Sequence, residues 1–269
     1  MKIIDSHIHW FAGDRAQDMA RRAGHENSED HLRKEYARLG IAGAVVMGNH
    51  DLEEAAHSYP DFFRYCIGLD STTDFAGNVK QTYEAVERNL RRKDCVGVKL
   101  YPGYDHHYVY DRIYSPVYEL AERYDKPVAI HTGETVFSAA RLKYSHPLTL
   151  DEVAVSFPKV QFVMCHLGNP WIVDAAAVLG KNHNVAADLS GFLAGTLDIH
   201  EYFREQEGYI THIKTWLAYL SAYDKLMFGT DWPLANIQNY IDFTKILIPE
   251  RHLEGVFADN ARRIYKLDF

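Results

Sequence analysis

The chain contains 269 residues, of which 47% are hydrophobic and 25% are charged, a composition that excludes an intrinsically disordered protein. Its formal charge of -8, from 29 basic and 37 acidic residues, argues against a protein that binds nucleic acid through a clustered basic surface. No segment has the roughly 18 uninterrupted apolar residues of a membrane helix, and the first residues do not form a secretion signal, so we expect a cytoplasmic enzyme without a membrane or nucleic-acid partner.

Eight short runs rich in apolar and β-branched residues follow one another along the chain, with segments of helical periodicity between them. Runs of this length and composition predict buried strands. The predicted strands are residues 2–9, 43–48, 64–70, 95–102, 127–134, 160–168, 184–190 and 225–233.

Three of the intervening segments carry clear helix signals. In SPVYELAERY, Ser115 is placed to cap a helix and Pro116 takes its first position, where the fixed backbone angle of proline suits a helix. Thr149 and Glu152 have the spacing of a capping box. A third helix is predicted before the last strand by the apolar stripe Ile213, Trp216, Leu217 and Leu220.

The alternation of eight strands with helices predicts a single α/β domain that spans residues 1–269. Parallel strands joined by crossovers can close at eight into a (β/α)8 TIM barrel, which is the fold class we predict. An open doubly wound sheet is the alternative. Against it, no GxGxxG motif follows any predicted strand, and polar residues gather at several strand ends rather than at one crevice.

The three cysteines lie far apart in apolar runs, and none belongs to a CxxC motif. An odd number in this setting predicts reduced thiols in the core rather than a disulfide framework. Histidines are more informative, because 15 of them in one chain justify a search for metal ligands. The cysteines are Cys66, Cys95 and Cys165.

Histidines recur at the ends of the predicted strands, beginning with DSHIH in the first. His7 and His9 are two residues apart and therefore project from the same side of a strand. His131 lies in the fifth strand, His166 in the sixth and Asp231 at the end of the eighth. In a TIM barrel the carboxyl ends of all strands meet at one mouth, so we expect these five residues to converge there.

Imidazole and carboxylate ligands of this kind suit Zn²⁺ and also accept Mn²⁺, Fe²⁺ or Ni²⁺. A catalytic metal keeps one coordination position open, so that a bound water can lose a proton near neutral pH and attack a carbon electrophile. Asp231 is placed to manage that proton, and His166 or the metal would polarise the substrate carbonyl.

Simpler roles exist for the individual residues. A single strand histidine such as His131 is often only a hydrogen-bonded core residue, and Asp231 precedes a proline-containing turn of the kind that aspartate commonly caps. The set as a whole favours metal ligands, because burying so many polar groups without partners would be costly. Lys99 alternates with Val98 and Leu100 in the fourth strand and is expected to face the barrel interior.

Several motifs together resemble the amidohydrolase superfamily, in particular its amidohydrolase-related (amidohydrolase 2) branch of metal-dependent TIM-barrel hydrolases, which includes aminocarboxymuconate-semialdehyde-decarboxylase-like proteins. The motifs are DSHIH, GVKLYP, AIHTGE, CHLGNPW, VAADLSG, FGTDWP and ADNARRIYKL, and they span nearly the whole chain. The resemblance implies a metal held by His7, His9, His131 and Asp231, with His166 as a further ligand or acid/base group.

Lys99 leaves two possibilities open. In binuclear members of the superfamily a lysine at the end of the fourth strand is carboxylated and bridges two metals, whereas a single metal is usual in the decarboxylase-like branch. Both fit this sequence. Lys99 is therefore a metal ligand only if it is carboxylated, and otherwise it binds a substrate carboxylate or pairs with a neighbouring acid.

The loops after the predicted strands supply candidate substrate-binding residues, namely Tyr101, Glu134, Arg141 and Trp171. The aromatic segment YPGYDHHYVYDRIY either walls a pocket for a planar or apolar substrate or packs on itself. An arginine near a metal often binds a carboxylate or phosphate, although most surface cations are simply solvated.

These features favour a metal-dependent hydrolase that cleaves an ester, lactone or amide bond of a small molecule with metal-activated water. Decarboxylation of an unsaturated or aromatic carboxylic acid is the alternative, since a metal and a proton donor at Asp231 would suffice for it. A barrel that only binds metal is a third hypothesis. The sequence leaves open whether the chain forms a homo-oligomer.

Overall fold

The protein, described by a computed structural model for residues 2–49, 51–73, 75 and 79–269, is built around eight parallel strands. Each strand overlaps one of the predicted runs. The strands are β1 (Ile3–Ile8), β2 (Ile41–Met47), β3 (Phe63–Leu69), β4 (Cys95–Leu100), β5 (Val128–Ile130), β6 (Phe162–Met164), β7 (Val185–Asp188) and β8 (Leu226–Met227).

Each strand pairs with the next along the chain, so the spatial order is the sequence order from β1 to β8. The circle is completed by backbone hydrogen bonds from the segment of β1 to the segment of β8. Ser6 donates to the carbonyl of Phe228 at 2.9 Å, and His9 donates to that of Trp232 at 2.7 Å. The predicted (β/α)8 TIM barrel is confirmed, and the open doubly wound sheet is excluded.

A buried carboxyl group fastens this seam. Asp5 accepts a hydrogen bond from the backbone N–H of Thr230 at 2.9 Å and a second from the Thr230 hydroxyl at 2.6 Å. Burial nevertheless raises the pKa of Asp5 to about 7, because a charge at this depth loses its hydration. The contact holds the turn that carries the following residue, Asp231, against β1.

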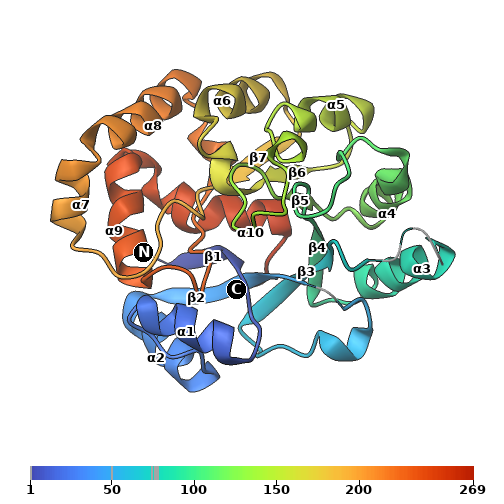
Figure 1. Ribbon diagram of the computed structural model, residues 1–269, viewed down its shortest axis with the longest axis horizontal. Helices are drawn as coiled ribbons and strands as arrows, with labels where there is room; N and C mark the ends of the chain where they lie inside the picture. Colours follow the sequence, from blue (N-terminus) through green and yellow to red (C-terminus); the bar gives the residue numbers. More distant parts are fainter. Residues whose placement is uncertain (1, 50, 74, 76–78) are drawn as a thin grey trace.

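The helices surround the strands (Figure 1). As predicted, Pro116 lies in the first turn of its helix, and Ile213 and Leu217 are buried on the stripe that also places Trp216 and Leu220 against the core. Within the described ranges, no helix is long and apolar enough to cross a membrane. The helices are α1 (Asp14–Arg22), α2 (Glu29–Leu39), α3 (Val79–Leu90), α4 (Ser115–Tyr124), α5 (Thr149–Ser156), α6 (Ile172–Lys181), α7 (Ile199–Glu205), α8 (Glu207–Leu220), α9 (Ile237–Leu247) and α10 (Asn260–Tyr265).

The inside of the barrel is packed, and α10 closes one end of it. Inward-facing Ile4 and Val163 form one apolar cluster with Ile264 of α10. The Asn260 side chain donates to the carbonyl of Leu226 at the start of β8, and α10 crosses behind the strands in Figure 1. Because α10 covers the amino-terminal ends of the strands, the polar residues at their carboxyl ends occupy the other, functional end.

Every strand ends before its predicted run does, and β5, β6 and β8 end at least four residues early. β6 stops at Met164 and β8 at Met227, whereas the apolar pattern extends to residues 168 and 233. His166 and Asp231 lie beyond these ends with φ of 62° and 57°, a left-handed conformation that few residues other than glycine adopt. The left-handed turn redirects each side chain away from the alternation of an extended strand.

Two predicted helix caps are wrong. Ser115 lies inside α4, and Thr149 inside α5, where its hydroxyl donates to the carbonyl of His146 at 2.8 Å. The residues that stand at the two caps, Tyr114 and Leu148, already have helical backbone angles and make no side-chain cap. A turn therefore precedes each helix, and its backbone groups take the place of the expected side-chain caps.

Candidate metal centre

His7 is a wholly buried residue near the carboxyl end of β1. Its Nδ1 lies 2.8 Å from Oδ2 of Asp188 on β7. An ionised carboxylate only accepts hydrogen bonds, so Nδ1 carries the proton and Nε2 keeps an unshared electron pair. Burial lowers the pKa of His7 to about 4, which keeps the ring neutral near pH 7. His7 is thus prepared to bind a metal through Nε2.

His9 follows β1 and is oriented by Asn49, two residues beyond the end of β2. Nδ1 of His9 lies 3.0 Å from the side-chain oxygen of Asn49. An amide oxygen is an acceptor, so Nδ1 is again the protonated nitrogen and Nε2 the bare one. The bare Nε2 atoms of His7 and His9 approach the same carboxylate.

Asp231 supplies that carboxylate from the turn after β8. Its Oδ1 lies 3.4 Å from Nε2 of His9 and 3.6 Å from Nε2 of His7. Oδ1 of Asp231 and Nε2 of His7 are both buried without a hydrogen-bond partner. Three lone-pair atoms without a proton among them repel one another unless a cation lies between them.

The three residues fit a single divalent metal. Ligand atoms bound at about 2.1 Å to a tetrahedral ion lie about 3.4 Å apart, which matches the separations of Asp231 from the two histidines. His7, His9 and Asp231 form a group whose ligand atoms all lie within 4.8 Å of one another. Two imidazoles and a carboxylate are ligands that Zn²⁺, Mn²⁺, Fe²⁺ and Ni²⁺ accept.

His131 and His166 form a hydrogen-bonded pair beside these ligands. His131 follows β5, and its Nε2 donates to the carbonyl of Glu134 at 3.0 Å, which leaves Nδ1 as an acceptor. Nε2 of His166 lies 3.2 Å from this Nδ1, and Nδ1 of His166 lies 2.8 Å from the Ser190 hydroxyl. Burial lowers the pKa of both imidazoles. The His166 ring is 4.8 Å from that of His7, so all five predicted residues converge.

Asp188 is a site residue that the sequence analysis did not single out. Besides His7, it binds the backbone N–H of His166 at 2.9 Å and the hydroxyl of Ser190. It is wholly buried, and the attraction and hydrogen bond of His7 outweigh the effect of burial and lower its pKa. A signal was present, because an acidic residue lies near the end of the seventh predicted strand in VAADLSG, the region from which the other site residues come.

Lys99 faces the barrel interior, as predicted, where its Nζ donates to Sγ of Cys165 at 2.9 Å. Its Nζ also lies 5.1 Å from the centre of the Tyr101 ring. Cys165 forms a second close group with His7 and Asp188, but those two already bind each other. Burial raises the pKa of the Cys165 thiol. The buried, free thiols predicted for the chain are confirmed in Cys66, Cys95 and Cys165.

The aromatic loop after β4 combines the two alternatives considered for it. The Tyr104 ring lies 4.9 Å from that of His131, and the Tyr101 ring lies 6.4 Å from that of His9. Beyond these two residues the loop packs on itself, as in the stacked rings of Tyr108 and Tyr110, which are 4.9 Å apart.

The other candidate substrate-binding residues lie around this mouth. Glu134 and Arg141 are exposed in the segment between β5 and α5, and the carbonyl of Glu134 orients His131. Trp171 is half-buried, with its ring 4.8 Å from that of His146. Their contact with a substrate stays a prediction.

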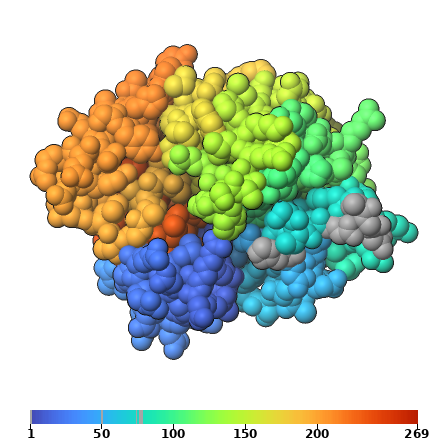
Figure 2. Space-filling view, in the orientation of Figure 1, coloured from blue at the N-terminus to red at the C-terminus, as the bar shows by residue number. Residues whose placement is uncertain are grey.

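The segment of residues 133–148 lies over part of the face seen in Figure 2, where its lime-coloured surface meets the blue amino-terminal segment. The guanidinium of Arg15 lies 4.9 Å from the centre of the Phe137 ring and joins the two segments. The neighbouring Val136 is 73% exposed. This segment gives the mouth a partly apolar rim.

Solved structures with the same fold include both decarboxylases and a hydrolase, whereas no curated protein sequence matches the chain. A 2,6-dihydroxybenzoate decarboxylase from Rhizobium is 17% identical with a TM-score of 0.67, over 100% of this chain and 99% of that one. A probable 2-pyrone-4,6-dicarboxylic acid hydrolase from Acinetobacter baumannii is 16% identical with a TM-score of 0.63, over 99% of this chain and 100% of that one.

A third structure in this group contains a divalent metal. It is a 5-carboxyvanillate decarboxylase from Novosphingobium aromaticivorans in complex with manganese and 4-hydroxy-3-methoxy-5-nitrobenzoic acid. It is 13% identical with a TM-score of 0.63, over 99% of this chain and 96% of that one. At such identities these likenesses establish the fold.

The family follows from the sequence itself. A family model described as amidohydrolase matches residues 4–267, from β1 to the residues just after α10, and the matched range includes every residue of the candidate metal centre. The chain therefore belongs to the amidohydrolase family.

Proposed function

We propose that this protein is a metal-dependent hydrolase that cleaves an ester, lactone or amide bond of a small molecule. The observation that carries the proposal is the convergence of Nε2 of His7, Nε2 of His9 and Oδ1 of Asp231 with no proton to share among them. A divalent cation, zinc before manganese, iron or nickel, relieves this repulsion. His131, whose Nδ1 lacks a proton, is the proposed fourth ligand, with His166 the remaining candidate ligand.

The residues divide the chemistry among them. When bound, the metal would act as a Lewis acid and lower the pKa of water. Asp231, buried and ionised, accepts the proton of the attacking water and returns it to the leaving group. Nε2 of His166 faces Nδ1 of His131 at 3.2 Å, and it would become free to donate a hydrogen bond to the substrate carbonyl if that Nδ1 bound the metal instead. Substrate contacts are proposed for Tyr101, Glu134, Arg141 and Trp171.

A single metal is part of the proposal. Nζ of Lys99 donates to Cys165 and thus occupies a position beside the three ligands as an amine donor. Elemental analysis of protein purified without added metal should give about one metal per chain, unchanged in Lys99→Ala. About two metals, falling on loss of Lys99 and depending on bicarbonate, would replace this proposal with a binuclear centre bridged by a carboxylated lysine.

Decarboxylation of an aromatic or unsaturated carboxylic acid is the second candidate, favoured by the two decarboxylases among the structural relatives. The same residues would serve, with the metal orienting the acid and Asp231 in its protonated form delivering a proton to the carbon that loses CO₂. Hydrolysis stays ahead because a metal bound by Asp231 would keep its carboxylate ionised, which is the form that accepts a proton, whereas decarboxylation needs the protonated form.

In the test, protein is treated with a chelator and reloaded with zinc or manganese. It is then incubated with a panel of esters, lactones and amides and, separately, with a panel of aromatic acids. Acid release and CO₂ release are both measured. Chelation should abolish activity and the metal should restore it. Asp231→Asn should lower kcat by about 10²- to 10⁴-fold. Asp198→Asn, which changes only the charge of the N-cap residue of α7, is the matched control and should retain activity.

The outcomes separate the three hypotheses. CO₂ release without any hydrolytic product would overturn the hydrolase in favour of the decarboxylase. A fully metallated protein that turns over neither panel would favour a barrel that only binds metal.

A further inference from the structure

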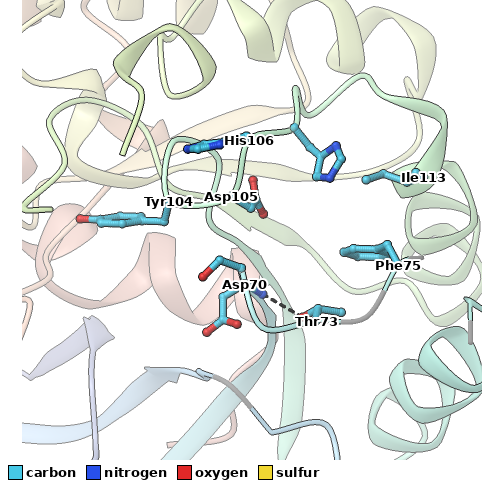
Figure 3. Close-up of a pocket in the computed structure, with 9 residues that line it drawn as sticks. Asp70, Thr73, Phe75, Tyr104, Asp105, His106 and Ile113 are labelled. Carbon is cyan, nitrogen blue, oxygen red and sulfur yellow. Dashed lines mark hydrogen bonds between the residues drawn. The ribbon is translucent and has the colours of Figure 1, made fainter. Parts of the chain in front are cut away.

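A cavity of about 470 Å³ lies between the loops that follow β3 and β4. Figure 3 shows Asp105 and His106 above this cavity, Asp70 and Thr73 below it, and Phe75 and Ile113 at its far side from Tyr104. None of these residues belongs to the candidate metal centre. The cavity is therefore a second feature of the same end of the barrel.

Asp105 is the residue that makes this cavity chemically unusual. The side chain is 6% exposed and lines the cavity. Its Oδ2 accepts a hydrogen bond from the Tyr114 hydroxyl at 2.8 Å, and the backbone N–H of His107 also favours the ionised carboxyl group, but Oδ1 is buried without a partner in hydrogen-bond geometry. Burial raises the pKa of Asp105 to about 7, as expected for a carboxyl group whose charge is incompletely compensated. A buried carboxylate oxygen of this kind requires a donor or a cation from outside the chain.

The other carboxylate at this cavity adds an acceptor, while the hydroxyls of Ser71 and Thr73 can donate or accept. Asp70 is a second buried carboxylate at the cavity. Nε2 of His106 donates to the carbonyl of Ala139 at 3.2 Å, so its Nδ1 is an acceptor. Among the described lining residues there is no lysine or arginine, while Phe75 and Ile113 supply apolar surface. The cavity thus suits a ligand that combines a positive charge with an apolar body.

Tyr104 connects this cavity to the metal centre. The residue lines the cavity, and its ring lies 4.9 Å from that of His131. Its hydroxyl accepts a hydrogen bond from the backbone N–H of Val136 at 3.2 Å, which holds the ring in place between the two. A small molecule that reaches past Tyr104 could place one end at the metal ligands and the other beside Asp105.

We propose that the Asp105 cavity is a substrate subsite that receives a protonated amine carried on an apolar stem, with Asp105 as the residue that determines this specificity. The identification of the occupant as substrate rests on the proposed function of the metal centre. The ammonium donates to Oδ1 of Asp105, and the stem lies against Phe75 and Ile113. The favoured substrates are accordingly amine-bearing esters, lactones or amides.

The test measures binding by calorimetry on the metal-loaded protein at pH 7, with benzylamine as the probe and benzyl alcohol as its uncharged counterpart. Benzylamine should bind the unaltered protein at least about tenfold more tightly, the difference expected of a charge-assisted hydrogen bond. Asp105→Asn should lose about that factor. Asp151→Asn is the control, because this carboxylate pairs with Lys181 and does not line the cavity.

Each result decides the proposal. The proposal would be overturned by equal affinities for benzylamine and benzyl alcohol, or by benzylamine binding that is unchanged in Asp105→Asn. The comparison of the two probes on the unaltered protein remains decisive even if the variant does not fold. Repeating the titration with His7→Ala separates the subsite from the metal centre. Benzylamine binding retained there, together with a lack of hydrolysis in the unaltered protein, would uphold the cavity and refute only the proposed reaction.

Discussion

Two histidines of the candidate metal centre have their ring tautomer selected by a residue from another part of the barrel. Asp188 on β7 holds the proton of His7 on Nδ1, and Asn49 after β2 does the same for His9. In both rings Nε2 is left free to bind a metal. Such partners orient a ligand and also raise its basicity, so their loss weakens a metal site without removing a ligand.

Asp188→Asn should therefore weaken metal binding by about 10- to 100-fold while the ligands themselves remain. An amide holds the Nδ1 proton of His7 less strongly than a carboxylate does, and its NH₂ group favours the opposite tautomer. Competition against a fluorescent chelator measures the affinity. Asp151→Asn, which loses a surface ion pair with Lys181, is the control. Unchanged affinity in the Asp188 variant would mean that Asp188 does not set the tautomer of His7.

Asp231 is a residue at which function opposes stability, because in metal-free protein its carboxylate faces the bare nitrogens of His7 and His9. Asn in its place would donate a hydrogen bond to one of them, and asparagine tolerates a φ of 57°. We expect metal-free Asp231→Asn to gain about 0.5–1.5 kcal/mol in the free energy of unfolding, or about 1–5 °C in Tm, while metal binding is weakened. Calorimetry in the presence of a chelator measures Tm. A lower Tm would contradict the repulsion.

At the level of elements, glycines allow β2 and β3 to approach closely at the mouth of the barrel. A Cβ added at Gly68 would lie 1.7 Å from the carbonyl oxygen of Gly48, so the two backbones would have to separate. That carbonyl also accepts the hydroxyl of Tyr101 at 2.7 Å, and Asn49 follows directly. The distance between β2 and β3 therefore affects the position of Asn49, which orients His9.

Gly68→Ala should lower the free energy of unfolding by about 1–3 kcal/mol, because the close approach leaves no room for a methyl group, and it should also weaken metal binding through Asn49. Urea unfolding and chelator competition measure the two effects. Gly208→Ala in α8 is the control, because no atom lies within 4 Å of its added Cβ and alanine favours a helix by up to about 1 kcal/mol. A Gly68 variant as stable as the parent would show that the strands can separate at no cost.

The sequence predicted all eight strands because each is a short apolar run, and it predicted that the five candidate ligands lie together because strand ends converge in a barrel. It did not predict that β6 and β8 stop before His166 and Asp231, since the left-handed φ of these residues leaves no mark in an apolar pattern. Nor did it predict the role of Asp105, whose missing partner depends on how separate loops pack.

At the scale of the whole molecule, burial shifts the pKa of several groups in opposite directions. Two carboxyl groups have a pKa raised to about 7, those of Asp5 and Asp105. Burial lowers the pKa of five imidazoles, to about 4 in the first two: His7, His25, His57, His131 and His166. The folded protein therefore holds these histidines neutral at a pH where an unfolded chain would protonate them.

The free energy of unfolding should consequently fall as the pH drops from about 6.5 toward 4. A histidine whose pKa is lower in the folded than in the unfolded state makes its full contribution to stability above about pH 6.5 and loses it as the pH falls. Because five histidines behave in this way, unfolding between pH 6.5 and 4 takes up as many as five protons. The two carboxyl groups each release one proton on unfolding. The net uptake is therefore at most about three protons, and the slope is up to about 4 kcal/mol per pH unit.

Urea unfolding of metal-free protein at three pH values between 6.5 and 4 measures this slope. His25 lies outside the candidate metal centre, and His25→Asn should lower the slope by about 1.4 kcal/mol per pH unit, the equivalent of one proton. Stability that is unchanged or higher at pH 5 than at pH 6.5 would contradict the neutral state of the buried histidines, and with it the form in which His7 can bind a metal.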